Sequence, residues 1–176
     1  FIAPTPMKMA TIKSDRLPEL MKNLATSNLM IITRCLVEWQ LHTMTRPSET
    51  AMAKWDEINL DNNTWVIPAE RMKKNKEHIV PLTPQTLALI DKLSQLRGNS
   101  VYLFPSHRGH NKHANTQTAN MALKRIGFKG ELVSHGLRAL ASTTLNEQRF
   151  DAELIEVCLA HVDRNTVRKA YNRSDY

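Results

Sequence analysis

The sequence predicts an α+β domain that is mostly helical and carries one small antiparallel β-sheet. Apolar residues recur at helical spacing along most of the 176 residues, and only 5 residues are glycine. One stretch in the first half instead holds short runs of β-prone residues around a polar turn, which indicates a hairpin. A chain of this length suits a single domain with a substantial core.

The helices follow from apolar periodicity and from their end signals. Ser14 or Asp15 is expected to cap the first helix, Pro47 suits the first turn of the third, and Gly98 closes the fourth. The expected helical ranges are 17–24, 28–42, 47 to about 54, 84–97, 115–126, 135–148, 151–159 and 165–171.

The predicted sheet has three strands, at 58–60, 64–67 and 78–82. Asp and Asn residues at 61–63 form the turn between the first two strands. Basic residues fill the connection before the third strand, and a polar, basic loop is expected at 106–113. The sheet is therefore small and edged by positive charge.

Charge and composition narrow the class of partner. Lys and Arg number 24 against 17 acidic residues, which gives a net charge of +7 and favours a polyanion without separating DNA, RNA and anionic membrane. No apolar run approaches the roughly 18 residues of a membrane span. Cys35 and Cys158 lie in apolar, helix-like sequence and are expected to be reduced thiols in the core.

His135 and Arg138 stand at the start of an expected helix. One helical turn separates them, so both face the same side, where the first N–H groups of the helix also favour a phosphate. Taken alone, the pair can also be a surface His and Arg that only solvate the helix.

Upstream, Arg46 precedes Glu49 by three residues, a spacing that favours a local ion pair. Glu49 could hold one edge of the guanidinium while the other edge faces a phosphate.

Two further clusters carry positive charge. Lys73, Lys74 and Lys76 lie at a hairpin tip or edge that can reach into a DNA groove or can simply be solvated. Tyr171 is surrounded by cations, including Arg164 and Arg168. A phenol, whose ordinary pKa is about 10, needs such surroundings to attack at neutral pH. The alternative is a buried or amphipathic tyrosine.

A metal is not expected to take part. His107, His110 and His113 recur at three-residue spacing, but their loop lacks nearby Cys or carboxylates, so contact with nucleic acid or solvent is favoured. The sequence contains no phosphate-binding Walker loop, no dinucleotide fingerprint and no carboxylate cluster typical of a two-metal nuclease. Phosphate chemistry would then rest on Arg, His and Lys, without a cofactor.

The ordered set of these residues resembles the tyrosine recombinases, and more narrowly the integrases of satellite prophages and genomic islands. The resemblance covers nearly the whole chain and is most specific at 55–61, 67–73, 78–82, 159–161 and 170–173. It implies the catalytic-domain fold of that family. The family's active-site residues fall on Arg46, Lys73, His135, Arg138, His161 and Tyr171, with a supporting acid on Glu49.

The resemblance also implies an activity: site-specific DNA recombination without metal or ATP, for integration or excision of a mobile element. Tyr171 would attack a DNA phosphate and form a 3′-phosphotyrosyl link, while Lys73 would protonate the leaving 5′-oxygen. Contacts to DNA are expected from Arg71, Lys74, Lys76, Arg164 and Arg168.

Three positions depart from the family pattern. Met44 stands where a glycine is usual two residues before the first arginine, Leu137 replaces an aromatic residue, and Ala160 replaces the glycine of Leu-Gly-His. The family further implies N-terminal arm-binding and core-binding domains and a C-terminal tail that docks on a neighbouring protomer. Residues 1–176 are therefore expected to be a catalytic domain with both ends trimmed.

The expected partner is double-stranded DNA at attachment sites, bound by a homotetramer, with a directionality factor as a further candidate. A bacterial cytoplasmic protein that joins the nucleoid when bound to DNA is expected, with no membrane association. Two alternatives stay open at this point. A non-catalytic DNA-binding regulator of the same fold would need only the basic surface, and a type IB topoisomerase would share the chemistry.

Overall fold

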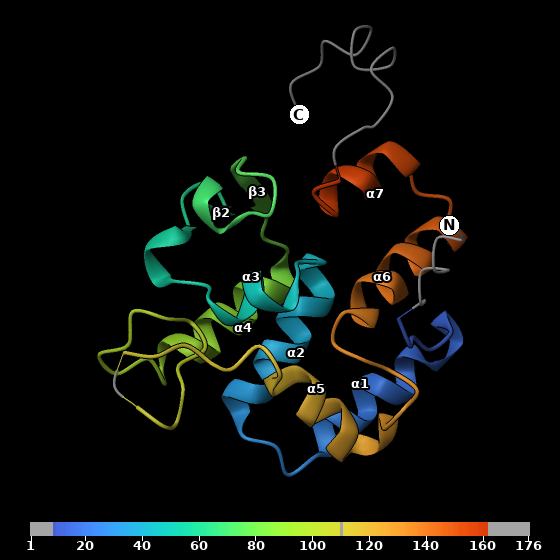
Figure 1. The fold of residues 1–176 in the computed structure, drawn as a ribbon, viewed down its shortest axis with the longest axis horizontal. Coiled ribbons are helices and arrows are strands. Elements are labelled where there is room, and N and C mark those ends of the chain that lie inside the picture. Colours follow the sequence, from blue (N-terminus) through green and yellow to red (C-terminus); the bar gives the residue numbers. More distant parts are fainter. Residues whose placement is uncertain (1–8, 110, 162–176) are drawn as a thin grey trace, which may run out of the picture.

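The computed structural model describes residues 9–109 and 111–161, and Figure 1 shows a helical body with a small sheet at one end. The predicted mostly helical α+β class with one antiparallel sheet is confirmed. In chain order the elements are α1 (Leu17–Thr26), α2 (Ile31–Thr43), α3 (Pro47–Ala51), β1 (Ile58–Asn59), β2 (Thr64–Ile67), β3 (His78–Pro81), α4 (Pro84–Ser94), α5 (Thr118–Leu123), α6 (Gly136–Glu147) and α7 (Ala152–Cys158).

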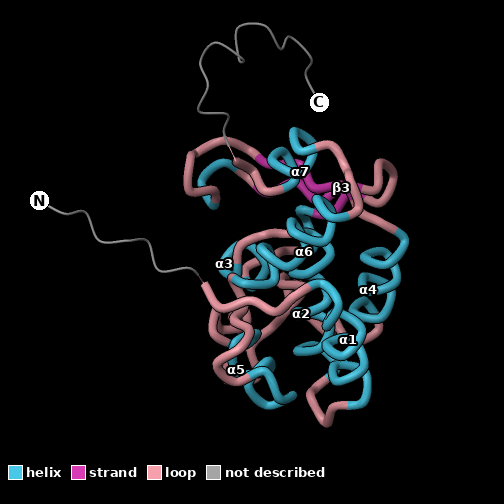
Figure 2. Tube along the Cα trace, turned by 90° about the vertical axis from the view of Figure 1, so that its right-hand side faces the viewer, coloured by secondary structure: helices cyan, strands magenta, loops and turns pink. Residues whose placement is uncertain are grey.

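Helix α2 is the centre of the helical body (Figure 2) and packs against α3, α4, α5 and α6. It can do so because apolar residues occupy most of its circumference, as expected of a buried helix. Trp39 on α2 is fully buried and meets Trp65 of β2 edge to face, with ring centroids 5.4 Å apart. Phe104 completes this aromatic cluster at 6.1 Å from Trp39. The sheet and the helices therefore share one core.

The sheet has the order β1-β2-β3 with antiparallel pairing throughout. Trp65 pairs with Val80 and Ile67 pairs with His78, and these two side chains of β2 are buried on the face toward the core. The expected turn at 61–63 is present, and Asn63 adopts the left-handed conformation (φ 50°) that Asn tolerates better than most residues.

Several expected boundaries differ from the structure. Ser14 and Asp15 do not cap α1: they form a 3-10 turn, Ser14–Arg16, and the Ser14 hydroxyl bonds to Glu147. Helix α5 is shorter than expected because the chain passes into a π-helical turn, Lys124–Phe128, that contains Gly127 at φ 105°. The last expected helix, 165–171, lies outside the described residues.

The two cysteines have different surroundings. Both are free thiols, as expected, and Cys35 is buried in the core. Cys158 is exposed on α7, so the prediction of a core position was wrong for this residue. Cys158 was expected in the core because its neighbours in the sequence are apolar. Leu154 and Val157 on the same helix are, however, themselves about half exposed (47% and 46%).

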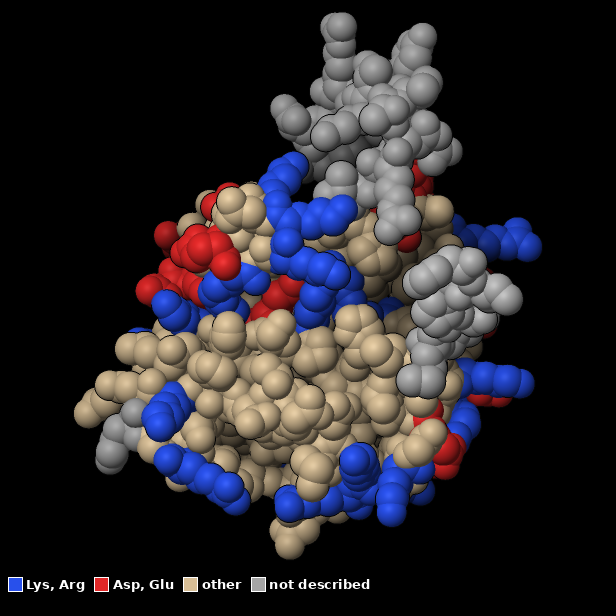
Figure 3. All heavy atoms as spheres, in the orientation of Figure 1, with Lys and Arg blue, Asp and Glu red and all other residues tan. Residues whose placement is uncertain are grey.

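One face of the molecule gathers positive charge. Figure 3 shows Lys and Arg side chains around the space between β3 and α7, above a broad neutral area over the helical body. Among the described helices, none is long and apolar enough to cross a membrane.

Candidate active site

Arg46 lies in the short connection between α2 and α3. Met44 ends α2 in the left-handed conformation (φ 52°, ψ 22°), and Pro47 begins α3. The Glu49 carboxylate accepts two hydrogen bonds from Arg46, one from the main-chain N–H at 2.7 Å and one from guanidinium Nη1 at 2.6 Å. The Glu49 side chain is 2% exposed and that of Arg46 is 21% exposed. A buried carboxylate therefore fixes one edge of a guanidinium that solvent still reaches, as the three-residue spacing predicted.

Three threonine hydroxyls hold this connection in shape. Thr43 donates to the Trp39 carbonyl at 2.8 Å, its Oγ1 lies 2.9 Å from Thr45 Oγ1, and Thr45 Oγ1 lies 2.7 Å from Thr50 Oγ1. All three threonines are buried. Because buried hydroxyls are costly unless they are paired, this chain of hydrogen bonds favours one arrangement of the α2–α3 turn and so one direction for Arg46.

Arg138 belongs to the first turn of α6 and is buried, with 5% of its surface exposed. Its Nη1 donates to the Met44 carbonyl and its Nη2 donates to the Leu159 carbonyl at 2.8 Å. Burial, with repulsion from Arg46 second, lowers the pKa of Arg138 to about 10, against the opposing attraction of Glu49. The guanidinium thus stays protonated at neutral pH.

Within residues 9–109 and 111–161, the charge of Arg138 has no carboxylate partner. Among the described residues it forms no salt bridge, and its guanidinium donates to two main-chain carbonyls. A buried charge is costly unless it is paired. The surroundings of Arg138 therefore favour binding of an anion.

His135 stands immediately before α6 and its side chain is exposed at the mouth of the site. Partial desolvation of the ring lowers the pKa of His135, repulsion from Arg138 and Arg46 lowers it further, and Glu49 opposes the shift. The shift therefore favours the neutral imidazole, which can accept a proton.

A buried polar network fixes the residue before His135. The Ser134 main-chain N–H donates to Asn120 Oδ1 at 2.6 Å, and its carbonyl accepts from Gln40 Nε2 at 2.8 Å. The Ser134 hydroxyl donates to Gln40 Oε1 at 2.8 Å. Gln40 and Ser134 are fully buried. Three elements, α2, α5 and the start of α6, are thereby tied to the position of His135.

Arg46 and His135 line the same open hollow of about 450 Å³. Its other walls come from Met9, Pro47, Ser48, Thr116, Gln117, Asn120 and Val133. Hydroxyl and amide groups on this rim can act as hydrogen-bond donors or acceptors. The hollow has the mixed lining that suits a sugar–phosphate chain, and its open shape suits a polymer better than an enclosed small ligand.

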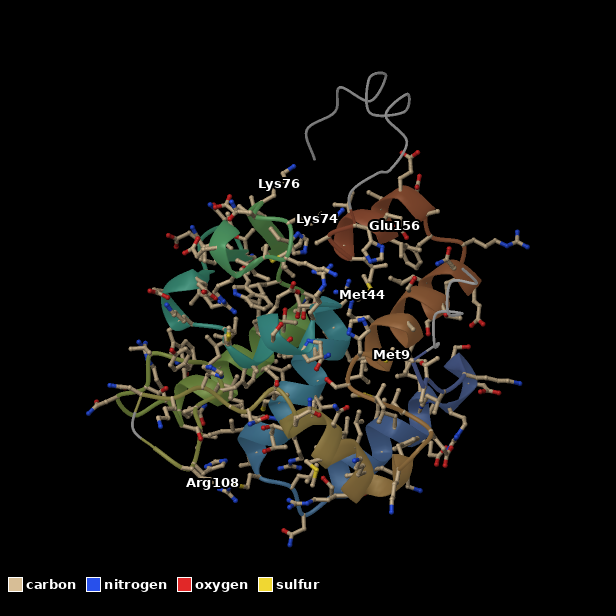
Figure 4. The ribbon with its side chains drawn as sticks, in the orientation of Figure 1. Met9, Met44, Lys74, Lys76, Arg108 and Glu156 are labelled. Atoms are coloured by element: carbon tan, nitrogen blue, oxygen red, sulfur yellow. The ribbon has the colours of Figure 1, made fainter. Side chains whose placement is uncertain are left out.

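His161 lies three residues after Cys158, the last residue of α7. It is exposed, and its Nδ1 lies 2.8 Å from a carboxylate oxygen of Glu156, which Figure 4 labels on α7. Ala160 before it is left-handed (φ 50°), the conformation for which glycine is usual at a helix end. Since Arg138 binds the Leu159 carbonyl, the end of α7 is joined to the arginine site.

Lys73, Lys74 and Lys76 lie exposed in the loop between β2 and β3, and Figure 4 shows Lys74 and Lys76 at the upper edge of the molecule. Arg71 was expected to contact DNA, but its side chain is nearly buried. Its side chain is 10% exposed, its Nη1 binds the Glu57 carboxylate, and its Nη2 donates to the Glu49 carbonyl at 2.6 Å. The Arg71 guanidinium is therefore engaged inside the domain.

Tyr171, Arg164 and Arg168 lie outside the described residues, as does His110. Within the described part, the structure brings Arg46, Glu49, His135 and Arg138 into one electrostatic group. His161 is linked to this group through the end of α7.

Comparisons with known proteins show which family the chain belongs to. Residues 10–176 match the model of the Phage integrase family. Prophage integrase IntA of Escherichia coli K12 is 51% identical over the whole chain, which covers 43% of that protein. The integrase of Enterobacteria phage P4 is 37% identical over 91% of the chain and 40% of its own length.

Solved structures share the fold. XerH site-specific recombinase bound to its difH substrate has a TM-score of 0.72 at 20% identity, covering 99% of this chain and 54% of that one. A lambda integrase dimer bound to a COC′ core site has a TM-score of 0.71 at 17% identity, covering 95% of this chain and 62% of that one. The chain belongs to the phage integrase family, and it spans less than half the length of the curated relatives it matches.

Sequence reasoning missed the residues that support the site. Gln40 and Ser134 are 94 positions apart, and the threonine chain consists of common residues with no distinctive spacing. One signal was available for Gln40: a polar residue inside the apolar run of α2 that the structure leaves fully buried. Such a residue must have a buried partner.

Proposed function

We propose that this chain is the catalytic domain of a site-specific recombinase that cuts and rejoins DNA through Tyr171. The observation that carries the proposal is the group formed by Arg46, Arg138 and His135. One guanidinium is held by a carboxylate, the other is buried and donates to two main-chain carbonyls, and both help to lower the pKa of the His135 imidazole. The names of the relatives and the DNA-bound neighbours of like fold support it further.

The proposed reaction is a transesterification. The Tyr171 phenolate oxygen attacks phosphorus, the bond from phosphorus to the 5′-oxygen breaks, and a 3′-phosphotyrosyl link forms. His135 accepts the tyrosine proton, and Lys73 gives a proton to the departing 5′-oxygen. A 5′-hydroxyl of another strand then reverses these steps. One phosphodiester is exchanged for another, so neither ATP nor a redox cofactor is required.

The two arginines and His161 act on the non-bridging oxygens. Negative charge grows there as the fifth bond to phosphorus forms, and fixed donors stabilise it without reorganising. Loss of one such donor typically costs about 10²–10³-fold in rate. Arg46→Ala should fall in this range. Arg138→Ala should lose more, because it also removes the bonds to the Met44 and Leu159 carbonyls.

The wider assembly belongs to the same proposal. A lambda integrase of like fold has been solved as a tetramer bound to a Holliday junction. We infer a tetramer of the full-length protein on two duplexes, in the bacterial cytoplasm and at the nucleoid when bound. Lys74, Lys76, Arg164 and Arg168 contact the DNA, and a directionality factor remains a candidate partner.

Covalent trapping tests the proposal. Full-length protein and a half-site with a nick near the cleavage point should yield a denaturant-resistant protein–DNA adduct, because the short strand diffuses away and cannot reseal. Tyr171→Phe should bind DNA and give no adduct. Tyr102→Phe is the matched control, since it removes a tyrosine hydroxyl outside the site and should leave the adduct intact.

The same assay separates the alternatives. No adduct from the unaltered protein would support a DNA-binding regulator without chemistry, and an adduct in Tyr171→Phe would refute the choice of nucleophile. Relaxation of supercoiled plasmid without strand exchange between two sites would instead favour a topoisomerase.

A further inference from the structure

Arg71 joins two parts of the domain that are separate in sequence. Its Nη2 donates to the Glu49 carbonyl on α3 at 2.6 Å, and its Nη1 binds the carboxylate of Glu57. Glu57 ends the 3-10 turn Trp55–Glu57 and is itself 8% exposed on its side chain. One guanidinium therefore bridges α3 and the base of the sheet from a nearly buried position.

Glu57 is held as firmly as Arg71. Its other carboxylate oxygen accepts from the indole N–H of Trp65 at 2.9 Å and from the main-chain N–H of Lys54 at 3.1 Å. Trp65 is fully buried on the central strand β2. A charged pair in such a setting has little freedom, because breaking it would leave one buried charge alone.

The Arg71 bridge stands immediately before the Lys73 loop. Arg71 ends the 3-10 turn Ala69–Arg71, and Met72 after it is buried, with 8% of its surface exposed. From Lys73 the chain is exposed, in a turn closed by the bond from the Asn75 N–H to the Met72 carbonyl at 2.9 Å. Lys73 is thus the first exposed residue after an anchored base.

Arg71 is connected through Glu49 to Arg46, the arginine proposed to bind the phosphate. Arg71 binds the Glu49 main-chain carbonyl, and the Glu49 carboxylate holds Arg46. The structure therefore contains a continuous path from the base of the Lys73 loop through Arg71 and Glu49 to Arg46.

We propose that Arg71 is a positioning residue, which fixes the Lys73 loop relative to the Glu49–Arg46 pair so that Lys73 reaches the leaving 5′-oxygen. This inference rests on the proposed function and deepens it. As the bond from phosphorus to the 5′-oxygen breaks, its electron pair stays on that oxygen, which takes a proton from Lys73 Nζ. Proton transfer needs heavy atoms within about 2.6–3.2 Å, and a misplacement near 1 Å can cost on the order of 10²-fold.

A bridging-sulfur substrate isolates this role. In a 5′-bridging phosphorothiolate the leaving group is a thiolate, whose conjugate acid is far stronger than an alcohol and which departs without a proton donor. The quantity measured is the ratio of cleavage rates on the sulfur and oxygen half-sites, at saturating DNA, with full-length protein. A variant that is partly unfolded loses rate on both substrates equally, so its ratio is unchanged.

Lys73→Ala sets the upper limit of the ratio. Arg71→Ala should lower cleavage of the oxygen half-site by about 10- to 100-fold, recover most of that loss on sulfur, and so raise the ratio toward that of Lys73→Ala. Arg71→Lys keeps a charge for Glu57 but loses the planar two-sided fork, and should fall between. Glu70→Ala is the matched control: it alters an exposed neighbour in the same turn and should keep both rates.

Each outcome bears on a separate claim. If Lys73→Ala is rescued by sulfur but the Arg71→Ala ratio stays at the unaltered value, Arg71 only supports the fold and this inference is wrong. If Lys73→Ala itself shows no rescue, the assignment of the acid fails and the inference about Arg71 falls with it. Amide exchange gives an independent measure, since exchange at 73–77 should quicken in Arg71→Ala and stay unchanged in Glu70→Ala.

Discussion

Met44 offers a quantitative test of how the turn before Arg46 is stabilised. It holds a left-handed conformation (φ 52°), which costs a residue with a side chain roughly 1–2 kcal/mol. Its side chain is nevertheless buried, with 5% of the residue exposed, in a small cluster with Ile155 and Leu159 at α7. Figure 4 shows Met44 at the centre of the molecule, below α7.

Two substitutions separate these opposing effects. Met44→Ala keeps the backbone strain and loses the packing, which for a buried methionine costs about 2–5 kcal/mol. Because this cluster is small, we expect a value near the lower end. Met44→Gly loses the same packing but relieves the strain, so it should be about 1 kcal/mol more stable than Met44→Ala. At ordinary positions the order is reversed, with glycine the less stable by about 0.5–1 kcal/mol.

Thermal unfolding of both variants measures the order directly. In a domain of this size 1 kcal/mol corresponds to roughly 2–4 °C in Tm, which is easily resolved. Ala88→Gly, at an exposed position within helix α4, is the control and should show the ordinary loss of about 1 kcal/mol. If Met44→Ala proves more stable than Met44→Gly, backbone strain at this turn is not significant. If Met44→Ala matches the unaltered protein, the packing onto α7 contributes nothing.

Other predictions concern the second left-handed residue, pH and ions. Ala160 has φ 50°, so Ala160→Gly should stabilise by about 1 kcal/mol, and a loss would mean that the methyl group packs usefully. Stability should decline as pH falls below about 6.5, because burial lowers the pKa of His42 and His78 and the unfolded chain then binds more protons. His78→Gln should flatten this decline, whereas a gain in stability on acidification to about pH 5.5 would contradict it. Cleavage by the full-length protein should persist in excess EDTA, and a loss that Mg²⁺ reverses would refute metal-independent chemistry. Binding of DNA should weaken steeply with salt, and salt-insensitive binding would argue against phosphate contacts.

The features that could be predicted from the sequence are those that depend on local patterns. Apolar periodicity predicted most of the helices, and the Asp and Asn residues at 61–63 predicted the hairpin, because both depend on residues close together in the chain. The Arg46–Glu49 pair was equally local, at three residues' spacing. The two departures from the family's glycines were visible, but only the structure shows that Met44 and Ala160 keep the left-handed backbone that glycine would favour.

The roles that could not be predicted from the sequence depend on partners that are distant in the chain. Arg71 looked like the lysines after it, since all belong to one basic stretch. What distinguishes it is Glu57, 14 positions earlier, and the Glu49 carbonyl, 22 positions earlier. Burial of Arg138 and its bonds to Met44 and Leu159 likewise depend on how α2, α6 and α7 pack. An arginine has the same side chain whether it lies in a solvated loop or in a buried bridge, so only the packing around it determines its role.

The charges around His135 connect its proton affinity to the proposed substrate. Glu49 balances Arg46, while Arg138 lacks a carboxylate partner among the described residues, and repulsion from both arginines adds to burial in lowering the pKa of His135. A phosphate between the arginines would bring negative charge to the point where that repulsion arises. At equal burial, the pKa of His135 must then rise, because an opposite charge nearby favours the protonated ring. His135 would stay neutral in the empty site and bind a proton more readily once phosphate is in place, which is when Tyr171 must give up its own.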